Sequence, residues 1–257
     1  MKGKYRAVIY LLSVFLVILA ILIIYVIYEN NYIKQSNTWE KFCTRNSFLD
    51  SPGAAIDSYL RAIEIIRKHG IDIKHCEDIF KDSQYANIPN DALNDFINLV
   101  VKGAESRKLG IKIKNPEPGT IEIYASDGRK FALENFRLLS NAIAHFAWLK
   151  SAEGKDVPTS ILLGKTNIAL GTQLSASAPN QKILRARGIA CKDLGLKTIE
   201  KCAPHSDENL MASISEMRQV LDKEFEIVKN MPPSKASFWD FFSRCMKTQD
   251  DVNETAQ

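Results

Sequence analysis

The residues that most resemble a nucleotide site are Leu163-Gly164-Lys165-Thr166, which match the end of a phosphate-binding loop. Such a loop needs a second glycine five positions before Gly164, because its backbone amides must wrap around the phosphates. Thr159 stands at that position, and the residues between are apolar or small. The sequence therefore predicts a turn at the end of a strand here, and no nucleotide or other cofactor.

Two histidines fall in segments with helical periodicity. His69 follows the first such segment, where a cation suits the carbonyl end of a helix. His145 lies one turn after Asn141 in another helical segment and beside Trp148. We predict that His145 is a hydrogen-bonded residue at the edge of the core, not a catalytic base.

The other two histidines lie near cysteines, the usual partners in a zinc site. His75 and Cys76 adjoin two acidic residues but lack a regular ligand spacing. The spacing of Cys191, Cys202 and His205 matches no standard zinc finger. The sequence predicts no metal site.

Five cysteines are too few and too scattered for a small disulfide-rich scaffold: Cys43, Cys76, Cys191, Cys202 and Cys245. The best candidate disulfide joins Cys191 to Cys202 across a segment that contains a glycine. In an oxidising compartment, a bridge closing so short a loop would stabilise the fold by about 2–3 kcal/mol. Free or buried thiols are the alternative, and a Cys43–Cys76 bridge is a weaker second pairing that leaves Cys245 single.

The chain lacks the common sequence signatures of a catalytic serine. It has neither a G-x-S-x-G elbow nor an S-x-x-K pair. A catalytic Cys–His site stays an alternative, because a cysteine and a histidine distant in sequence can meet in the folded chain. We therefore identify no catalytic residue, and the sequence favours a protein that is not an enzyme.

Four segments have the 3.6-residue apolar period of helices: 51–70, 91–108, 134–150 and about 207–229. Ser51-Pro52 is typical of a helix start, and Gly70 of a helix end. Between the second and third helices the period changes to two, and Asp127-Gly128 is a strong hairpin signal. Residues 110–133 are therefore predicted to form a three-stranded antiparallel meander.

The remaining segments predict less regular structure. Residues 161–163 and 168–170 are short apolar runs between glycines and a proline, typical of strands. Residues 175–205 contain two prolines and two glycines and are interpreted as mainly loop. The predicted fold class is α+β, a mixed helical domain with a small antiparallel sheet after an N-terminal transmembrane helix.

That transmembrane helix is predicted over Ala7–Tyr28, which contains no charge, glycine or proline. As a helix this segment would be about 33 Å long, and a bilayer core is about 30 Å thick. It lacks a signal-peptidase site, so it is interpreted as an uncleaved signal anchor. Lys2, Lys4 and Arg6 place the N-terminus in the cytoplasm by the positive-inside rule. The domain would then be extracytoplasmic, in a bacterial periplasm at the inner membrane.

The predicted organisation is a cytoplasmic N-terminus over 1–6, the span over 7–28, a juxtamembrane stalk over 29–50, a soluble domain over 51–247, and a disordered acidic tail over 248–257. Near the end of the domain a short helix carries more apolar surface than one face can bury: Phe238, Trp239, Phe241 and Phe242. It would dock on the core, or contact a partner or the bilayer surface.

The net charge of +4 lies mostly before the span, so the rest has 31 basic and 30 acidic residues. A nearly neutral domain without a basic cluster argues against nucleic-acid binding. The leading hypothesis is a single-pass protein whose domain binds other envelope or membrane proteins as an assembly component, with lipid contacted through residues 7–28. A membrane-tethered hydrolase with a Cys or His site and a ligand-binding or sensor domain are the alternatives.

Overall fold

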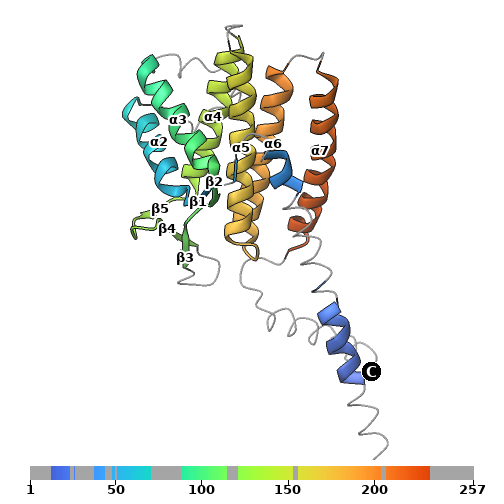
Figure 1. Ribbon diagram of the computed structural model, residues 1–257. Helices are drawn as coiled ribbons and strands as arrows, with labels where there is room; N and C mark the ends of the chain where they lie inside the picture. Colours follow the sequence, from blue (N-terminus) through green and yellow to red (C-terminus); the bar gives the residue numbers. More distant parts are fainter. Residues whose placement is uncertain are drawn as a thin grey trace, which may run out of the picture. The chain divides into compact units, whose positions relative to one another are not determined.

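The computed structural model describes residues 13–23, 26, 38–43, 48–49, 51–70, 88–114, 121–152, 156–203 and 207–231. The chain divides into two compact units, Met1–Thr38 and Trp39–Gln257. In the first unit the described residues form a helix over 13–23. The second unit carries the elements labelled in Figure 1.

The helices labelled α2 to α7 stand side by side in the second unit (Figure 1): α2 (Ile56–Lys68), α3 (Asn90–Glu105), α4 (Glu134–Ala152), α5 (Val157–Ser177), α6 (Lys182–Cys202) and α7 (Glu208–Lys229). Residues 38–43 are also helical. Two helix starts have side-chain caps: Asp156 accepts a hydrogen bond from Thr159 N at 3.1 Å, and Asp207 accepts one from Leu210 N at 3.0 Å. Such caps satisfy backbone amides that the first turn leaves without partners. Gly70, with φ +70°, follows the end of α2, as the sequence predicts.

Two small sheets lie at one end of α2 and α3 (Figure 1). Strands β1 (Ser51–Ala54) and β2 (Ser106–Lys108) form a parallel pair, so the start of α2 meets the end of α3 and these helices run antiparallel. Strands β3 (Lys112–Lys114), β4 (Glu122–Tyr124) and β5 (Lys130–Phe131) form the predicted antiparallel meander in the order β3-β4-β5. Gly128, with φ +87°, makes its hairpin turn, as the Asp-Gly pair predicts.

Helix α5 is buried on nearly all sides over its middle, from Leu163 to Ser175. It packs closely against α6 because glycines face each other at two levels. A Cβ on Gly171 would lie 2.4 Å from the carbonyl oxygen of Gly188, and one on Gly195 would lie 2.6 Å from that of Gly164. The two backbones therefore touch, as happens in helix pairs with small residues at the contact.

The second unit has two hydrophobic clusters that share α5. The first lies among α2, α3, α4 and the sheets, and includes Tyr59, Phe96, Phe136 and Phe146. The second lies among α5, α6, α7 and residues 39–43 and 48–49, and includes Trp39, Phe48, Leu196 and Leu221. Leu170 belongs to the first cluster and Ile168 to the second, so opposite faces of α5 serve both.

The predicted transmembrane helix over Ala7–Tyr28 is contradicted. Among the residues that the structure describes, no helix is both long enough and apolar enough to cross a membrane. Within that segment the structure describes residues 13–23 and 26. Ala7 and Tyr28 themselves lie outside the described residues. The signal anchor and the single-pass membrane location are contradicted by the same finding, and the cytoplasmic N-terminus and the periplasmic domain, which depend on the span, lose their support.

The α+β fold class is also wrong, because the described part of the chain is mostly helical with small sheets. The runs 161–163 and 168–170, predicted as strands, are both inside α5. The predicted loop over 175–205 contains α6. Helix α5 is buried on nearly all sides, and the buried face of α6 contains Arg185, Gly188, Lys192, Gly195 and Thr198. Neither therefore shows the one-sided apolar period that identifies a helix in sequence.

The predicted Cys191–Cys202 disulfide is wrong as well. Both are free, buried thiols on α6. Eleven residues of helix separate their Cα atoms by about 16 Å, and a disulfide needs less than about 7 Å. Cys76, Cys245 and the aromatic residues Phe238, Trp239, Phe241 and Phe242 lie outside the described residues.

Candidate functional site

The segment that resembles a phosphate-binding loop is in the middle of α5, not at a strand end. Gly164 lies against α6, where a Cβ would come within 2.4 Å of Ile199 Cγ1. Thr166 donates its hydroxyl to the Leu162 carbonyl at 3.0 Å. The glycine serves helix packing, and helical amides bonded along the chain cannot wrap a phosphate.

The predicted histidine and cysteine candidates that the structure describes are buried or structural. His69 is the C-cap residue that directly follows α2, close to the predicted helix end. His145 is fully buried in α4, with its ring centroid 5.8 Å from that of Trp148, so it is deeper than the predicted core edge. His75 and His205 lie outside the described residues.

Burial also determines the chemistry of the thiols. It raises the pKa of Cys43 to about 12 and that of Cys191 to about 11. A thiol must ionise to act as a nucleophile or a metal ligand, so both are inert at neutral pH. Among the described residues, no group of three or more His, Cys, Asp and Glu side chains could hold a metal ion.

A buried ion pair joins α6 to α7 inside the second cluster. Lys192 Nζ donates to both carboxylate oxygens of Glu224, at 2.8 and 2.7 Å, and both residues are at most 2% exposed. Trp39 Nε1 donates to Glu224 Oε2 at 3.1 Å, and its ring centroid lies 4.9 Å from Lys192 Nζ. The carboxylate is thus bonded on both oxygens, and Trp39 shields the ammonium group.

A second buried polar group connects α2, α3 and α5. Tyr59 donates its hydroxyl to Gln173 Oε1 at 2.8 Å. Gln173 Nε2 donates to the carbonyl oxygens of Gly103 and Ser106, at 2.9 and 2.5 Å. The Tyr59 ring fills the space beside Gly103, where a Cβ would be only 2.4 Å away. Both buried groups hold helices together, and neither is open to a ligand.

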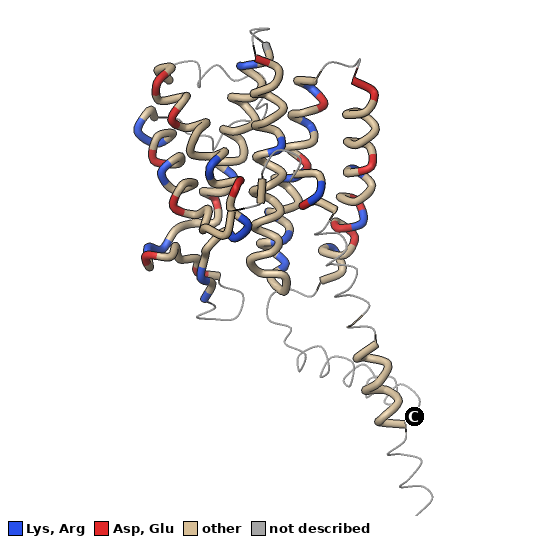
Figure 2. The backbone as a smooth tube through the Cα atoms, in the orientation of Figure 1, with Lys and Arg blue, Asp and Glu red and all other residues tan. Residues whose placement is uncertain are grey.

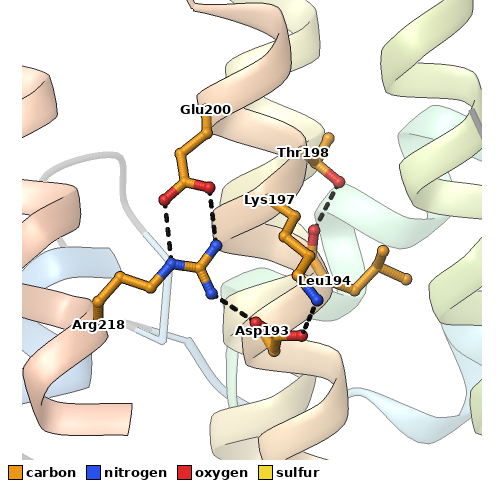
Figure 3. A network of polar contacts seen from close by, with 6 residues as sticks. All are labelled: Asp193, Leu194, Lys197, Thr198, Glu200 and Arg218. Carbon is orange, nitrogen blue, oxygen red and sulfur yellow. Dashed lines mark hydrogen bonds and ion pairs between the residues drawn. The ribbon is translucent and has the colours of Figure 1, made fainter. Parts of the chain in front are cut away.

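The outer side of the α6–α7 contact carries a half-exposed network (Figure 3). Arg218 on α7 donates Nε and Nη2 to the two carboxylate oxygens of Glu200, at 3.0 and 2.8 Å, and Nη1 to Asp193 at 2.5 Å. Lys197 pairs with the other oxygen of Asp193 at 2.7 Å. These bonds raise the pKa of Arg218, the bond to Glu200 most of all. The network holds α7 against α6, and the charges of its members are paired with one another.

An open groove of about 500 Å³ lies between α2 and α3. Its lining comes from positions one and two turns apart on each helix: Arg61, Glu64, Ile65 and Lys68 from α2, and Asp95, Asn98, Leu99 and Lys102 from α3. Ile65 and Leu99 are half-buried, and the charged and amide residues of the lining are exposed. The groove thus has apolar positions between polar ones, which is what a docked amphipathic helix requires.

Charge is unevenly distributed along this groove. Because α2 and α3 run antiparallel, Arg61 and Lys102 are both at the end near β1 and β2, and Lys68 and Asp95 are at the other end. Glu64 forms an ion pair with Arg129 of the β4–β5 hairpin, at 3.6 Å. No ion pair joins Arg61 or Lys102 to another described residue. The end near the strands is therefore positive.

Some of these features have a signal in the sequence that periodicity alone misses. Gly164 and Gly171 are seven residues apart, as are Gly188 and Gly195, which is the spacing of one helix face meeting another. Asp156 followed by Pro158 is a helix-start signal. The groove residues repeat at helical spacing on the polar side of two helices that the sequence predicts, although α2 begins at Ile56 and the predicted start, Ser51-Pro52, is in strand β1. The approach of the two helices to each other depends on tertiary structure.

No protein-family model, no curated protein and no solved structure matches this chain.

Proposed function

We propose that this chain is a protein-binding domain, and that a helical segment of a partner protein binds in the groove between α2 and α3. The observation that carries the proposal is the lining of the groove, in which Ile65 and Leu99 lie between charged residues of both helices. An amphipathic helix would bury its apolar stripe on these two side chains and leave its polar residues beside the charged ones. The partner helix would add a third member to the α2–α3 pair.

The charges of the groove favour one direction of the bound partner helix. A partner carboxylate near Arg61 and Lys102 would meet two cations, and a cation there would be repelled. Near Lys68 and Asp95 both signs are present, so that end selects less strongly. We therefore expect the partner helix to carry Asp or Glu at the end that lies nearest the strands.

Site-specific photo-crosslinking in cells tests the proposal. A photoreactive amino acid replaces Leu99 in the full-length chain, and the control replaces Phe225, which is 53% exposed on α7. We expect an adduct from position 99 and none of the same mass from position 225. Mass spectrometry of the adduct should map to an amphipathic helical segment with an acidic end.

Charge reversal provides the second arm of this experiment. Arg61→Glu with Lys102→Glu should reduce the yield of the position-99 adduct about tenfold, since both attractive contacts become repulsive. Circular dichroism should remain unchanged, because both side chains are exposed. An adduct that maps to an extended or basic segment, or that survives the charge reversal, would contradict the proposed function.

A further inference from the structure

We infer that the outer face of the β3–β4–β5 sheet is a second binding surface, which takes an extended acidic segment of another protein as an additional strand beside β3. This surface is separate from the α2–α3 groove and does not depend on it. Five residues form the face: Lys112, Lys114, Glu122, Tyr124 and Lys130. They will be called the lysine face.

Strand register places these side chains together. Lys112 pairs with Tyr124, and Tyr124 with Lys130, so the three form one row across the sheet. Lys114 pairs with Glu122 in the next row. Alternate residues of a strand point to opposite faces, so both rows are on the same side.

The opposite side of the sheet belongs to the core. Ile123 is 1% exposed, and the Phe131 ring packs edge-on against Phe136 with centroids 5.4 Å apart. Ile113 is half-buried on the same side. This burial fixes the register, because a shift by one residue would move the lysines into the core.

The lysine face has one carboxylate, and that carboxylate is already bonded. Glu122 pairs with Lys130 and accepts the Tyr124 hydroxyl proton in a 2.7 Å hydrogen bond. The bond from Lys130, followed by that from Tyr124, lowers the pKa of Glu122 and keeps it ionised. Lys114 Nζ lies 4.9 Å from the Tyr124 ring centroid. Lys112 and Lys114 are exposed and form no ion pair with any described residue, so the face attracts anions.

Strand β3 also offers backbone partners at its outer edge. It pairs with β4 on one side, and on its other side no described residue forms a backbone hydrogen bond with it. A peptide added there would place residues i and i+2 beside Lys112 and Lys114, and residue i+1 beside Ile113. The fitting sequence is acidic–apolar–acidic.

The same face suits a peptide better than a nucleic acid. Glu122 lies among the lysines and would repel phosphates. A single-stranded nucleic acid needs a basic groove that follows many phosphates, with open aromatic rings for base stacking. Here the Tyr124 ring is already covered on one side by Lys114.

Fluorescence anisotropy with the full chain and labelled synthetic peptides tests this inference. The first peptide alternates Glu and Val, the second alternates Lys and Val, and the third has the composition of the first with its glutamates grouped. We expect binding of the first alone. Lys112→Glu with Lys114→Glu should weaken it at least tenfold, and Lys112→Gln with Lys114→Gln about threefold.

A matched charge reversal outside both surfaces controls for net charge. Lys108→Glu with Lys223→Glu, at exposed positions on β2 and α7, changes the net charge equally and should leave the affinity for the alternating peptide within twofold. Hydrogen exchange should show new protection of the β3 amides when the peptide is bound. Equal binding of the grouped peptide, preferential binding of a single-stranded oligonucleotide, or unchanged affinity after reversal of both lysines would overturn the inference.

Discussion

At the scale of single residues, the Lys192–Glu224 pair is the most demanding feature of the second cluster. Two ions removed from water lose several kcal/mol of hydration each, which their attraction recovers only with good geometry. Here both oxygens of Glu224 are bonded and Trp39 contributes a third contact. Burial is the main cause that lowers the pKa of Lys192, and Glu224 opposes it. Each ion is therefore tolerable only while the other is present.

We expect Glu224→Leu and Lys192→Met each to lower the free energy of unfolding by about 3–5 kcal/mol, since each leaves an uncompensated buried charge. The double change Lys192→Met with Glu224→Leu should recover most of this loss, because apolar pairs of similar volume pack without charge. Urea denaturation measures all three. Additive losses in the double variant would mean that the two residues do not depend on each other.

The buried thiol of Cys43 should resist modification and make stability depend on pH. Its pKa is about 12 in the folded chain and 9.0 when exposed, so below pH 9 both states keep the proton. Between these values the unfolded chain loses the proton while the folded chain keeps it, and stability falls as pH rises. The stability advantage of the wild type over Cys43→Ala should therefore shrink above pH 9.

A thiol reagent should modify Cys43 quickly only after denaturation, and fast labelling of the native chain would contradict its burial.

At the scale of helices, the contact between α5 and α6 decides the architecture. Gly171 and Gly188 allow the two backbones to meet, and Ser175 Oγ would be 2.3 Å from a Cβ on Gly188. Larger residues would push the helices apart and disturb both clusters, because α5 contributes to each. The helix pair is therefore the part of the fold least tolerant of added volume.

The sign of the stability change caused by Gly188→Ala tests this packing. Helix propensity alone predicts that alanine stabilises the helix by about 1 kcal/mol. Overpacking at a backbone contact predicts a loss of about 1–3 kcal/mol, and we expect the loss. Gly53→Ala, in strand β1, is the control for an added methyl group without a close contact, since its Cβ would meet no atom closer than 3.5 Å. Thermal unfolding of both variants gives the comparison, and a stabilised Gly188→Ala would show that the contact is looser than described.

The sequence predicts α2, α3 and α7, which have one apolar face, and also α4, although residues 142–147 of α4 are all buried. The β3–β5 meander follows from its period of two and the Asp-Gly turn. The sequence does not predict α5, which is buried on nearly all sides, or α6, whose buried face contains charged residues and glycines. The glycines needed for contact between these two helices look like breaks. The groove lies on predicted helices, but the pairing of α2 with α3 depends on the β1–β2 contact, for which the sequence gives no clear signal.

At the scale of the whole second unit, the two hydrophobic clusters are coupled through α5 and α6, each of which contributes buried residues to both. Leu49 N donates to the Ala104 carbonyl at 3.0 Å, so residues 48–49 are tied to the end of α3. Phe48 is fully buried in the second cluster. The unit should therefore unfold in one cooperative transition.

Phe48→Ala should lower the free energy of unfolding by about 3–5 kcal/mol through the cavity that it leaves. Phe225→Ala, which truncates an exposed ring on α7, should change it little. Tryptophan fluorescence and far-ultraviolet circular dichroism should give the same midpoint for the wild type, for which a single transition is expected. Separate midpoints would show that the two clusters unfold independently.

The contact between Trp39 and Glu224 joins residues 185 positions apart. While a ribosome makes this chain from its N-terminus, Trp39 emerges early and its carboxylate partner only after α7 has been translated. The first cluster needs only residues up to about the middle of α6, and can condense sooner. Until then Trp39, Cys43 and Phe48 have no place to bury, so a nascent chain stalled before α7 should be a substrate for chaperones.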